Sequence, residues 1–303
     1  MHLIAKDSTV LAAFKTGELD IGSMIPSDER ESMKDKGLVT ESSLGTYYLS
    51  INLNINDGEI RSQENEALLQ SQVRRALALA IDRNYIVKNV TMSGELPADT
   101  FIPPSLQKDS TGNDIYNSLE KWWDNNNYKE NCNEARNILQ TAGINGSDIT
   151  IEYLYNSEGG HGAIAEAIQN MWKEELGITT TCRNEEWAVF QDSRDTGKFQ
   201  IARNGWIADY HDAMTFSDLL VSTSPQNNSF YNNAVYDEVI TQAKASQGAI
   251  YDNLIIQAEK ILKEETPVIP IYFYTNSYLK AANITGTYTY MNHLYFKNAI
   301  KTN

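Results

Sequence analysis

The chain has 303 residues, a length that predicts about two domains or one large domain. Its 40 Asp and Glu residues outnumber its 25 Lys and Arg residues, which gives a formal net charge of −15. This acidic composition argues against non-specific nucleic-acid binding and against attachment to anionic lipid headgroups, because both depend on clustered positive charge. The longest apolar run, 76–81, is too short for a membrane-spanning helix, which needs about 20 residues.

The N-terminal part of the chain is predicted to contain helices, two short strands and long connections. Asp7, Ser8 and Thr9 are N-cap candidates for a first helix that ends at Gly17. Asp82 is expected to cap a later helix that runs to Val90. The other predicted elements are a strand at 19–21, a Tyr-rich strand at 46–52, a polar loop at 54–66, a helix at 72–81, a Pro-rich connection at 97–104 and a short helix at 134–141.

From residue 149 onward, strands and helices alternate. Strands are predicted at 149–155, 178–183 and 199–203, with a helix ended by Gly177 and a helix at 187–195 between them. A helical region at 234–265, interrupted near Gly248, precedes a buried strand at 268–274. This order predicts an α/β fold with a mixed or parallel sheet, in two lobes between which the chain crosses.

The segment 203–212, which follows a predicted strand, has the densest group of candidate binding residues. It contains Arg203, Trp206 and Asp209 within seven positions. A tryptophan beside an acidic residue at a strand end can form a stacking wall next to a carboxylate that pairs with a cation. The alternative is structural: Trp206 belongs to the core, and Asp209 caps a helix that begins near Ala213.

Further candidates lie on neighbouring elements. Arg194 and Arg203 could form a bidentate site for a carboxylate or phosphate beside Trp187, or could simply neutralise local acidic residues. His161 follows two glycines at a predicted helix start, where backbone N–H groups attract anions, or it is a solvated terminal residue.

Signatures of catalysis and of metal binding are lacking in the sequence. It has no GxSxG, HExxH or P-loop motif, and its four histidines and two cysteines are scattered. We therefore predict a non-enzymatic protein with no catalytic residue, no metal site and no cofactor. Whether Cys132 and Cys182 form a disulfide is left open.

Several stretches, in order along the chain, resemble the oligopeptide-binding proteins among the extracytoplasmic solute-binding proteins of ABC importers. They are AAFKTGELDI at 12–21, VRRAL at 73–77 with AIDR at 80–83, the proline pair at 103–104, GWIADY at 205–210 with MTF at 214–216, and TPVIPIY at 266–272. The resemblance covers nearly the whole chain and implies a bilobal periplasmic-binding-protein-like fold with mixed sheets.

The resemblance also implies that this sequence is the C-terminal portion of a longer chain, with the N-terminal part of the first lobe missing. Residues 1–60 and 275–303 would then form a partial first lobe, and residues 61–274 a second α/β lobe with most of the visible ligand site. The start of the sequence lacks the pattern of a signal peptide. The full-length protein is nevertheless expected to be extracytoplasmic, in the periplasm or anchored at the cell surface.

Site residues follow from the same resemblance. Asp209 matches the aspartate that pairs with the peptide α-ammonium, as a buried carboxylate opposite an amine. Trp187 and Trp206 match aromatic residues that line side-chain pockets. The cationic residues that meet peptide carboxylates are matched by Arg194, Arg203 and His161. Tyr274 matches a tyrosine near the peptide N-terminus.

The resemblance implies capture of oligopeptides for import, by a monomer that works with the permease subunits of an ABC transporter. An alternative keeps the fold and changes the ligand to a signalling peptide, an oligosaccharide or a metal chelate. A carboxylate-pair hydrolase is a more distant alternative, and a fragment that folds without binding anything is a third.

Overall fold

The structure is a computed structural model that describes residues 6–23, 25–26, 29–54, 63–290 and 293–302. The helices are α1 (Asp7–Lys15), α2 (Arg30–Met33), α3 (Gln63–Leu69), α4 (Ser71–Leu79), α5 (Arg83–Tyr85), the π-helix η2 (Ile86–Thr91), α6 (Tyr128–Thr141), α7 (His161–Leu176), α8 (Trp187–Asp195), α9 (Met214–Ser217), α10 (Ala234–Lys244) and α11 (Gly248–Glu265). Short 3₁₀ turns lie at Ile115–Ser118, Gly146–Asp148 and Asp218–Leu220.

The strands are β1 (Ile21–Gly22), β2 (Leu38–Ile51), β3 (Leu96–Pro97), β4 (Thr150–Asn156), β5 (Thr179–Glu185), β6 (Ile201–Ile207), β7 (Val268–Lys280), β8 (Ile284–Thr285), β9 (Tyr288–Tyr290), β10 (His293–Tyr295) and β11 (Ile300–Lys301). Within the described ranges, seven of them form one sheet in the order β1-β7-β2-β6-β4-β5, with β3 also paired to β7. Strand β4 is parallel to β5 and β6, whereas β2 is antiparallel to β6 and β7. The predicted α/β fold with a mixed sheet is confirmed.

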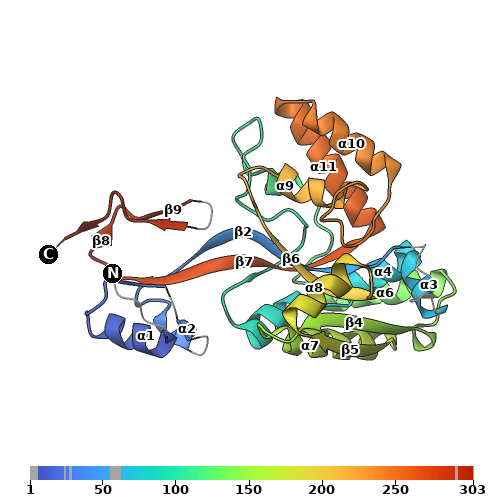
Figure 1. Cartoon of the computed structure of the whole chain (residues 1–303), viewed down its shortest axis with the longest axis horizontal. Coiled ribbons are helices and arrows are strands. Elements are labelled where there is room, and N and C mark those ends of the chain that lie inside the picture. The colour runs from blue at the N-terminus through green and yellow to red at the C-terminus, as the bar shows by residue number, and fades with distance from the viewer. Residues whose placement is uncertain (1–5, 24, 27–28, 55–62, 291–292, 303) are drawn as a thin grey trace.

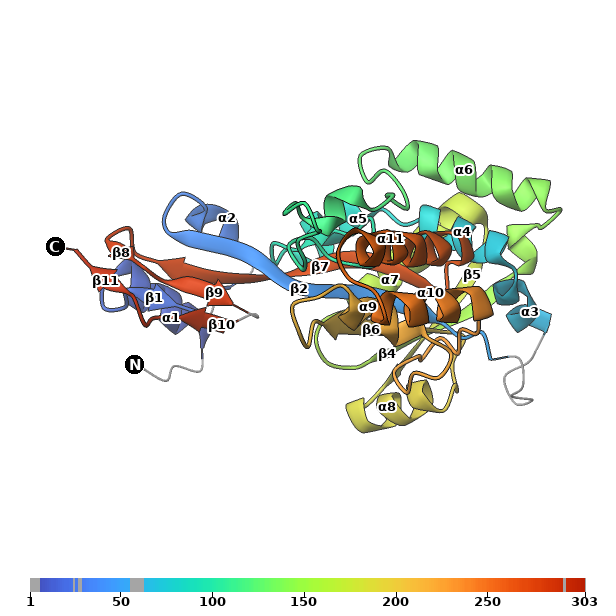
Figure 2. The same ribbon diagram turned by 90° about the horizontal axis from the view of Figure 1, so that it is seen from above.

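Two long antiparallel strands join a small end of the molecule to a larger body (Figure 1). Strand β2 has 14 residues and spans roughly 46 Å at 3.3 Å per residue. The small end contains α1, α2, the short strands β8–β11 and both termini, and Figure 2 shows the same arrangement from above. Because β2 and β7 run through both parts without a break, the division into 1–60 plus 275–303 and 61–274 stays a prediction.

Each part has its own hydrophobic core. In the small end, Leu11 and Met33 pack with Leu279 of β7. The larger body buries a continuous core, in which the indole of Trp172 on α7 donates to the carbonyl oxygen of Leu77 on α4 at 2.9 Å. Helix α7 thereby packs against α4 within the core of the larger body.

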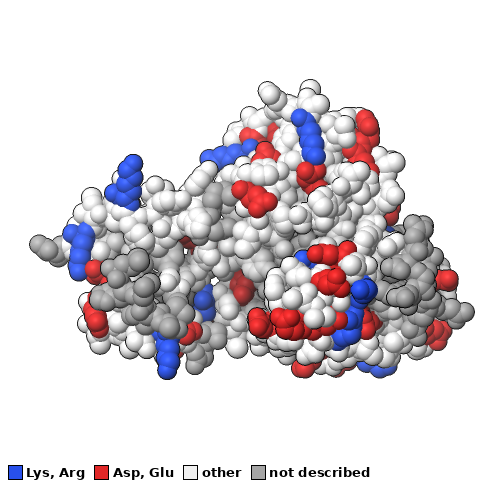
Figure 3. All heavy atoms as spheres, viewed as in Figure 1, with Lys and Arg blue, Asp and Glu red and all other residues white. Residues whose placement is uncertain are grey.

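Acidic side chains gather over the part of the larger body where α8 lies (Figure 3). They include Glu186, which caps this helix, and Asp192, which pairs with Lys198 at 3.4 Å. Part of the excess of negative charge in the sequence is therefore a solvated surface over α8.

Three charged side chains, Arg74, Arg83 and Glu259, are buried in the larger body and bind mainly backbone groups; we call them the buried set. Each is at most 3% exposed. The Arg74 guanidinium donates to the carbonyl oxygens of 68, 69, 265 and 266, and Arg83 donates to those of 78, 81 and 270. These arginines therefore tie α4 and α5 to the end of α11 and to β7.

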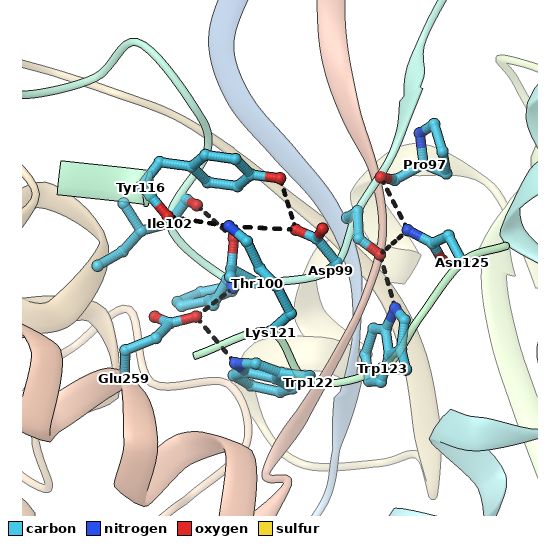
Figure 4. Close-up of polar contacts among 12 residues, drawn as sticks. Pro97, Asp99, Thr100, Ile102, Tyr116, Lys121, Trp122, Trp123, Asn125 and Glu259 are labelled. Atoms are coloured by element: carbon cyan, nitrogen blue, oxygen red, sulfur yellow. Dashed lines mark hydrogen bonds and ion pairs between the residues drawn. The ribbon is translucent and has the colours of Figure 1, made fainter. Parts of the chain in front are cut away.

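Glu259 of α11 fastens the long connection 98–123 to the helix (Figure 4). One carboxylate oxygen accepts from the backbone N–H of Phe101 at 2.5 Å and from the indole of Trp122 at 3.0 Å, and the other oxygen has no hydrogen-bond partner among the described residues. Burial raises the pKa of Glu259 to about 7. Lys121, whose ammonium lies 2.9 Å from the Tyr116 carbonyl oxygen and 3.8 Å from Asp99, opposes this shift weakly.

Several element boundaries differ from those predicted. Lys6 precedes α1 without a side-chain cap, and Asp7 lies in the first turn, so the predicted cap at 7–9 is wrong. Helix α6 begins at 128 instead of 134, and α3 occupies 63–69, where the sequence predicts a loop at 54–66; residues 55–62 lie outside the described residues. The cap at Asp82 is confirmed, and the left-handed Gly177 ends α7 as predicted.

Strands β2 and β7 are both much longer than the sequence predicts, and each owes its extra length to the other. Residues 38–42 pair with residues 275–279 of β7, beyond an irregularity between Ser42 and Thr46 where Leu44 has a φ of 44°. A left-handed residue interrupts the local strand pattern, so only the pairing with β7 defines this strand.

Candidate functional site

Strand β6 carries the central candidate residues, because it lies in the sheet between β2 and β4. Side chains alternate between the two faces of a strand, so Arg203 and Gly205 point to one face and Asn204 and Trp206 to the other. The candidate residues of segment 203–209 therefore lie on two faces of the sheet, although their close spacing in the sequence suggests a single group.

Arg203 lies at the junction of three elements. Its Nε donates to the side-chain oxygen of Asn156, at the end of β4, at 2.7 Å. Its guanidinium carbon is 5.5 Å from the ring centroid of Trp187 and 5.4 Å from that of Phe190, both on α8. Among the described residues, this Nε bond is the only hydrogen bond of the guanidinium group, so its other N–H groups are available to an anion.

His161 begins α7 and packs against β2. It follows the left-handed Gly159 and Gly160, its Nδ1 lies 3.3 Å from the hydroxyl of Tyr47, and the two rings stack with centroids 5.6 Å apart. Burial, helped by the charge of Arg203, lowers the pKa of His161 to about 4. Its surroundings therefore keep the imidazole neutral at pH 7, whereas the resemblance implies a cationic residue here.

Tyr274 completes an aromatic group on the same face of the sheet. Its ring packs edge-on against Tyr272 and Tyr47, at centroid distances of 5.5 and 6.4 Å. Burial raises its pKa to about 12, although the charge of Arg203 acts in the opposite direction. The structure thus brings four predicted residues, Arg203, His161, Trp187 and Tyr274, around one face of β6; we call them the β6 set.

Trp187 is the most exposed aromatic member of this set. The residue is 42% exposed, and its ring stacks on the fully buried Phe190 at 5.9 Å. An indole held by a buried ring on one side and open on the other can form the wall of a pocket for an apolar side chain.

Arg194 lies outside the β6 set, and its guanidinium contacts side chains of neighbouring residues. It is on α8, where its Nη1 donates to the side-chain oxygen of Asn204 at 3.0 Å and its Nε lies 3.7 Å from the carboxylate of Asp195. The amide of Asn204 in turn donates to Ser50 and to Asn228. These contacts agree with the structural alternative for Arg194, in which the guanidinium neutralises acidic residues nearby.

Trp206 and Asp209 lie at the far end of β6 and meet at Thr215. The Thr215 hydroxyl is 3.1 Å from the indole nitrogen of Trp206 and 3.3 Å from the backbone nitrogen of Asp209. Asp209 is exposed, so the carboxylate that the resemblance implies to be buried is open to solvent in this chain. Ala213 is the N-cap of α9, which has no side-chain cap hydrogen bond, so the alternative in which Asp209 caps the next helix is wrong.

The sequence did not identify the residues that support these groups. Tyr47, Tyr272, Phe190 and Asn156 all contact members of the β6 set and are at most 5% exposed. A signal for the two tyrosines existed, since Tyr47 lies in the predicted Tyr-rich strand at 46–52 and Tyr272 in the predicted buried strand at 268–274. Phe190 and Asn156 gave no such signal, because their contacts come from the packing of α8 on β4 and β6.

Neither a metal site nor a disulfide is found in the part of the chain that the structure describes. No group of three His, Cys, Asp or Glu residues there could hold a metal ion, and Cys132 and Cys182 are both free thiols. Among the described helices, none combines the length and the apolar composition needed to cross a membrane.

Comparison with known proteins finds one family over most of the chain. Residues 1–228 match the model described as bacterial extracellular solute-binding proteins, family 5 Middle. The chain is 33% identical over 281 residues to the periplasmic murein peptide-binding protein MppA of Escherichia coli. This alignment covers 91% of the chain and 49% of MppA. It is 30% identical to the oligopeptide-binding protein OppA of Bacillus subtilis, over 99% of this chain and 54% of OppA.

Solved structures agree in fold. The unliganded open form of the murein tripeptide-binding protein MppA aligns over 93% of this chain and 53% of its own, with a TM-score of 0.77 and 30% identity. The Haemophilus influenzae OppA in complex with RPPGFSPFR aligns over 97% of this chain and 56% of its own, with a TM-score of 0.72 and 26% identity. The chain spans about half the length of the relatives that it matches.

Proposed function

This chain belongs to the bacterial extracellular solute-binding proteins of family 5, and we propose that it is the part of an ABC importer's binding protein that captures oligopeptides. The named relatives bind murein peptide and oligopeptides, which supports a peptide ligand here. In this proposal the protein acts outside the cytoplasmic membrane as a monomer, delivers its ligand to the permease subunits and catalyses no reaction.

The observation that carries the proposal is the placement of opposite charges along β6. The incompletely bound guanidinium of Arg203 lies near the middle of the strand, and the exposed carboxylate of Asp209 follows its end. Six residues of extended chain span roughly 20 Å at most, which leaves room for a short extended peptide between the two charges. A free α-ammonium would pair with Asp209 and a terminal carboxylate with Arg203, both through charge-assisted hydrogen bonds.

The aromatic residues between and beside these charges support a ligand with variable side chains. Trp187 offers an open ring face beside Arg203, and Tyr274 of β7 lies in the same β6 set, whereas Trp206 lies on the other face of β6. An extended peptide gains most of its affinity from its main chain, and the side-chain pockets then adjust selectivity. Bridging waters allow such pockets to accept different polar side chains.

A pair of ligands that differ only at the amine tests the proposal. Isothermal titration calorimetry of the purified protein with trialanine and with N-acetyl-trialanine should show binding of the first and at least about ten-fold weaker binding of the second. Asp209→Asn should remove this difference. Asp192→Asn, which changes an exposed carboxylate paired with Lys198, should preserve it. Equal affinity of wild type for both ligands would remove Asp209 from the proposed role, and native mass spectrometry of co-purified ligand would then identify the ligand class.

A further inference from the structure

Two glycines lie on the same face of neighbouring strands, in the middle of the sheet. Gly45 of β2 pairs with Ile207, and Gly205 of β6 pairs with Tyr47, so the two glycines are diagonal neighbours. Neither has a left-handed φ. A glycine inside a strand weakens it and frequently marks a place where another group approaches closely. The φ angles do not require glycine here, so the cause must lie in the atoms that approach these two positions.

The group that approaches is the side chain of Tyr274. A Cβ atom at Gly205 would collide with the hydroxyl oxygen of Tyr274, and would lie 3.4 Å from the ring carbon that bears it. A Cβ atom at Gly45 would lie 2.8 Å from Cδ2 of the same ring and 2.9 Å from the Trp206 carbonyl oxygen. The ring therefore occupies the space that two side chains would fill, and it rests directly on β2 and β6.

The ring has little freedom to move sideways. Tyr272 lies on one side with its ring nearly perpendicular to that of Tyr274, at an interplanar angle of 88°, and Tyr47 lies edge-on at 75°. Tyr272 and Tyr47 are both at most 5% exposed. A side chain added at 205 would accordingly push the tyrosine away from the sheet, toward the face where the β6 set is exposed.

We propose that Gly205 is a positioning residue that keeps the ring of Tyr274 flat against β6 and thereby leaves room for an extended peptide over Arg203. This proposal rests on the proposed function, since it treats the ring of Tyr274 as the floor of the peptide site. The distance of the ring from the sheet then sets the space that the peptide has. Gly45 accommodates the other edge of the same ring. We call the two glycines the glycine seat.

The two glycines of the seat face different atoms of Tyr274, and this difference makes the proposal testable. The collision at 205 is with the tyrosine hydroxyl oxygen alone, because the next ring atom lies at an ordinary contact distance. Phenylalanine at 274 lacks that oxygen and would accept a methyl group at 205. The collision at 45 involves a ring carbon and a backbone oxygen, both of which remain in Tyr274→Phe.

The experiment combines these substitutions and measures both the Tm and the affinity for trialanine well below the Tm. Gly205→Ala should lower the Tm by about 3 °C or more and weaken trialanine binding about ten-fold or more, beyond any effect of the small unfolded fraction. In the Tyr274→Phe background, the same Gly205→Ala change should leave both values within error of Tyr274→Phe alone, or raise the Tm, since alanine is favoured over glycine in a strand. Gly45→Ala should be damaging in both backgrounds.

The outcomes separate the two proposals. If Gly205→Ala is equally damaging with phenylalanine at 274, or harmless with tyrosine, the steric assignment of the seat is wrong. If the Tm values follow the expected pattern and trialanine affinity does not change with them, the seat serves folding only and the proposed role in binding is overturned. If wild type binds no trialanine while the Tm values follow the pattern, the role in peptide binding falls together with the proposed function, and the steric assignment stands.

Discussion

The buried set and the β6 set each contain arginine, but they differ in what its guanidinium group binds. Arg83 donates to three backbone carbonyl oxygens, and its guanidinium carbon lies 3.4 Å from the ring centroid of Trp123. Arg203 has one side-chain partner and two aromatic neighbours. Both are arginines of a strongly acidic chain, yet Arg83 is 1% exposed, whereas Arg203 is only partly buried and its remaining N–H groups are available to a ligand.

The difference indicates which substitutions should affect folding and which should affect binding. A buried charge whose partners are backbone groups leaves several unsatisfied groups behind when it is removed, so its loss destabilises the protein strongly. A half-buried charge with a single partner leaves little unsatisfied. Four substitutions, described from the largest expected effect to the smallest, can break or sharpen this distinction.

Arg83→Met should have the largest effect. It leaves the carbonyl oxygens of Ala78, Ile81 and Pro270 without a donor and removes the contact with Trp123. We expect a loss of about 4 kcal/mol in the free energy of unfolding, measured by urea denaturation followed by circular dichroism. Arg203→Met, the matched arginine of the β6 set, should lose less than about 1 kcal/mol. A loss of similar size for both variants would contradict the distinction.

Glu259→Gln should change how stability depends on pH. Burial raises the pKa of Glu259 from its ordinary value of 4.5 to about 7, so between these values the folded protein retains a proton that the unfolded chain has lost. The free energy of unfolding of wild type should therefore fall as pH rises through this window, by on the order of 3 kcal/mol. Glutamine keeps the oxygen that accepts from Phe101 and Trp122 but does not titrate, so the fall should disappear in urea melts at a series of pH values. A fall of the same size in the variant would show that Glu259 is not its source.

Arg203→Lys should weaken binding without weakening the fold. Lysine keeps the positive charge but cannot present the planar pair of donors that matches a carboxylate. We expect about ten-fold weaker binding of trialanine by calorimetry, with a change below about 1 kcal/mol in the free energy of unfolding. Lys198→Met, at an exposed lysine that pairs with Asp192, is the control and should bind as wild type does. Unchanged affinity in Arg203→Lys would place the peptide carboxylate elsewhere.

His161→Gln should have the smallest effect, and the wild-type pH dependence that it removes runs opposite to that of Glu259. Burial lowers the pKa of His161 from 6.5 to about 4, so in this window the unfolded chain binds a proton that the folded chain does not. The contribution of His161 to stability should therefore fall as pH decreases from about 6.5 to about 4. Because the side chain is only partly buried, we expect a change of about 1 kcal/mol.

The measurement is clearest in the Glu259→Gln background, where the opposite slope is absent. Urea melts of the single and double variants between pH 4 and 6.5 then isolate the histidine. If the free energy of unfolding of Glu259→Gln does not depend on pH over this range, solvent reaches the imidazole of His161 and its pKa stays at the ordinary value.

Local sequence determined much of the fold around these two regions. The alternation from 149 to 203, the cap at Asp82 and the stop at Gly177 follow from hydrophobic period and from the conformational preferences of single residues. Both depend on neighbours within one or two turns of chain, so a single sequence contains them. The ordered motifs likewise identified the family and nominated Arg203, His161, Trp187 and Tyr274, which the fold brings together.

Only the tertiary structure decided what these residues bind and how exposed they are. The length of β2 comes from its pairing with β7, and the low pKa of His161 comes from burial against Tyr47 beside Arg203. The same holds for Arg194, which binds Asn204, and for Asp209, which is exposed instead of buried. Burial and hydrogen bonding are properties of contacts between segments far apart in the chain, and such contacts leave no local pattern in the sequence.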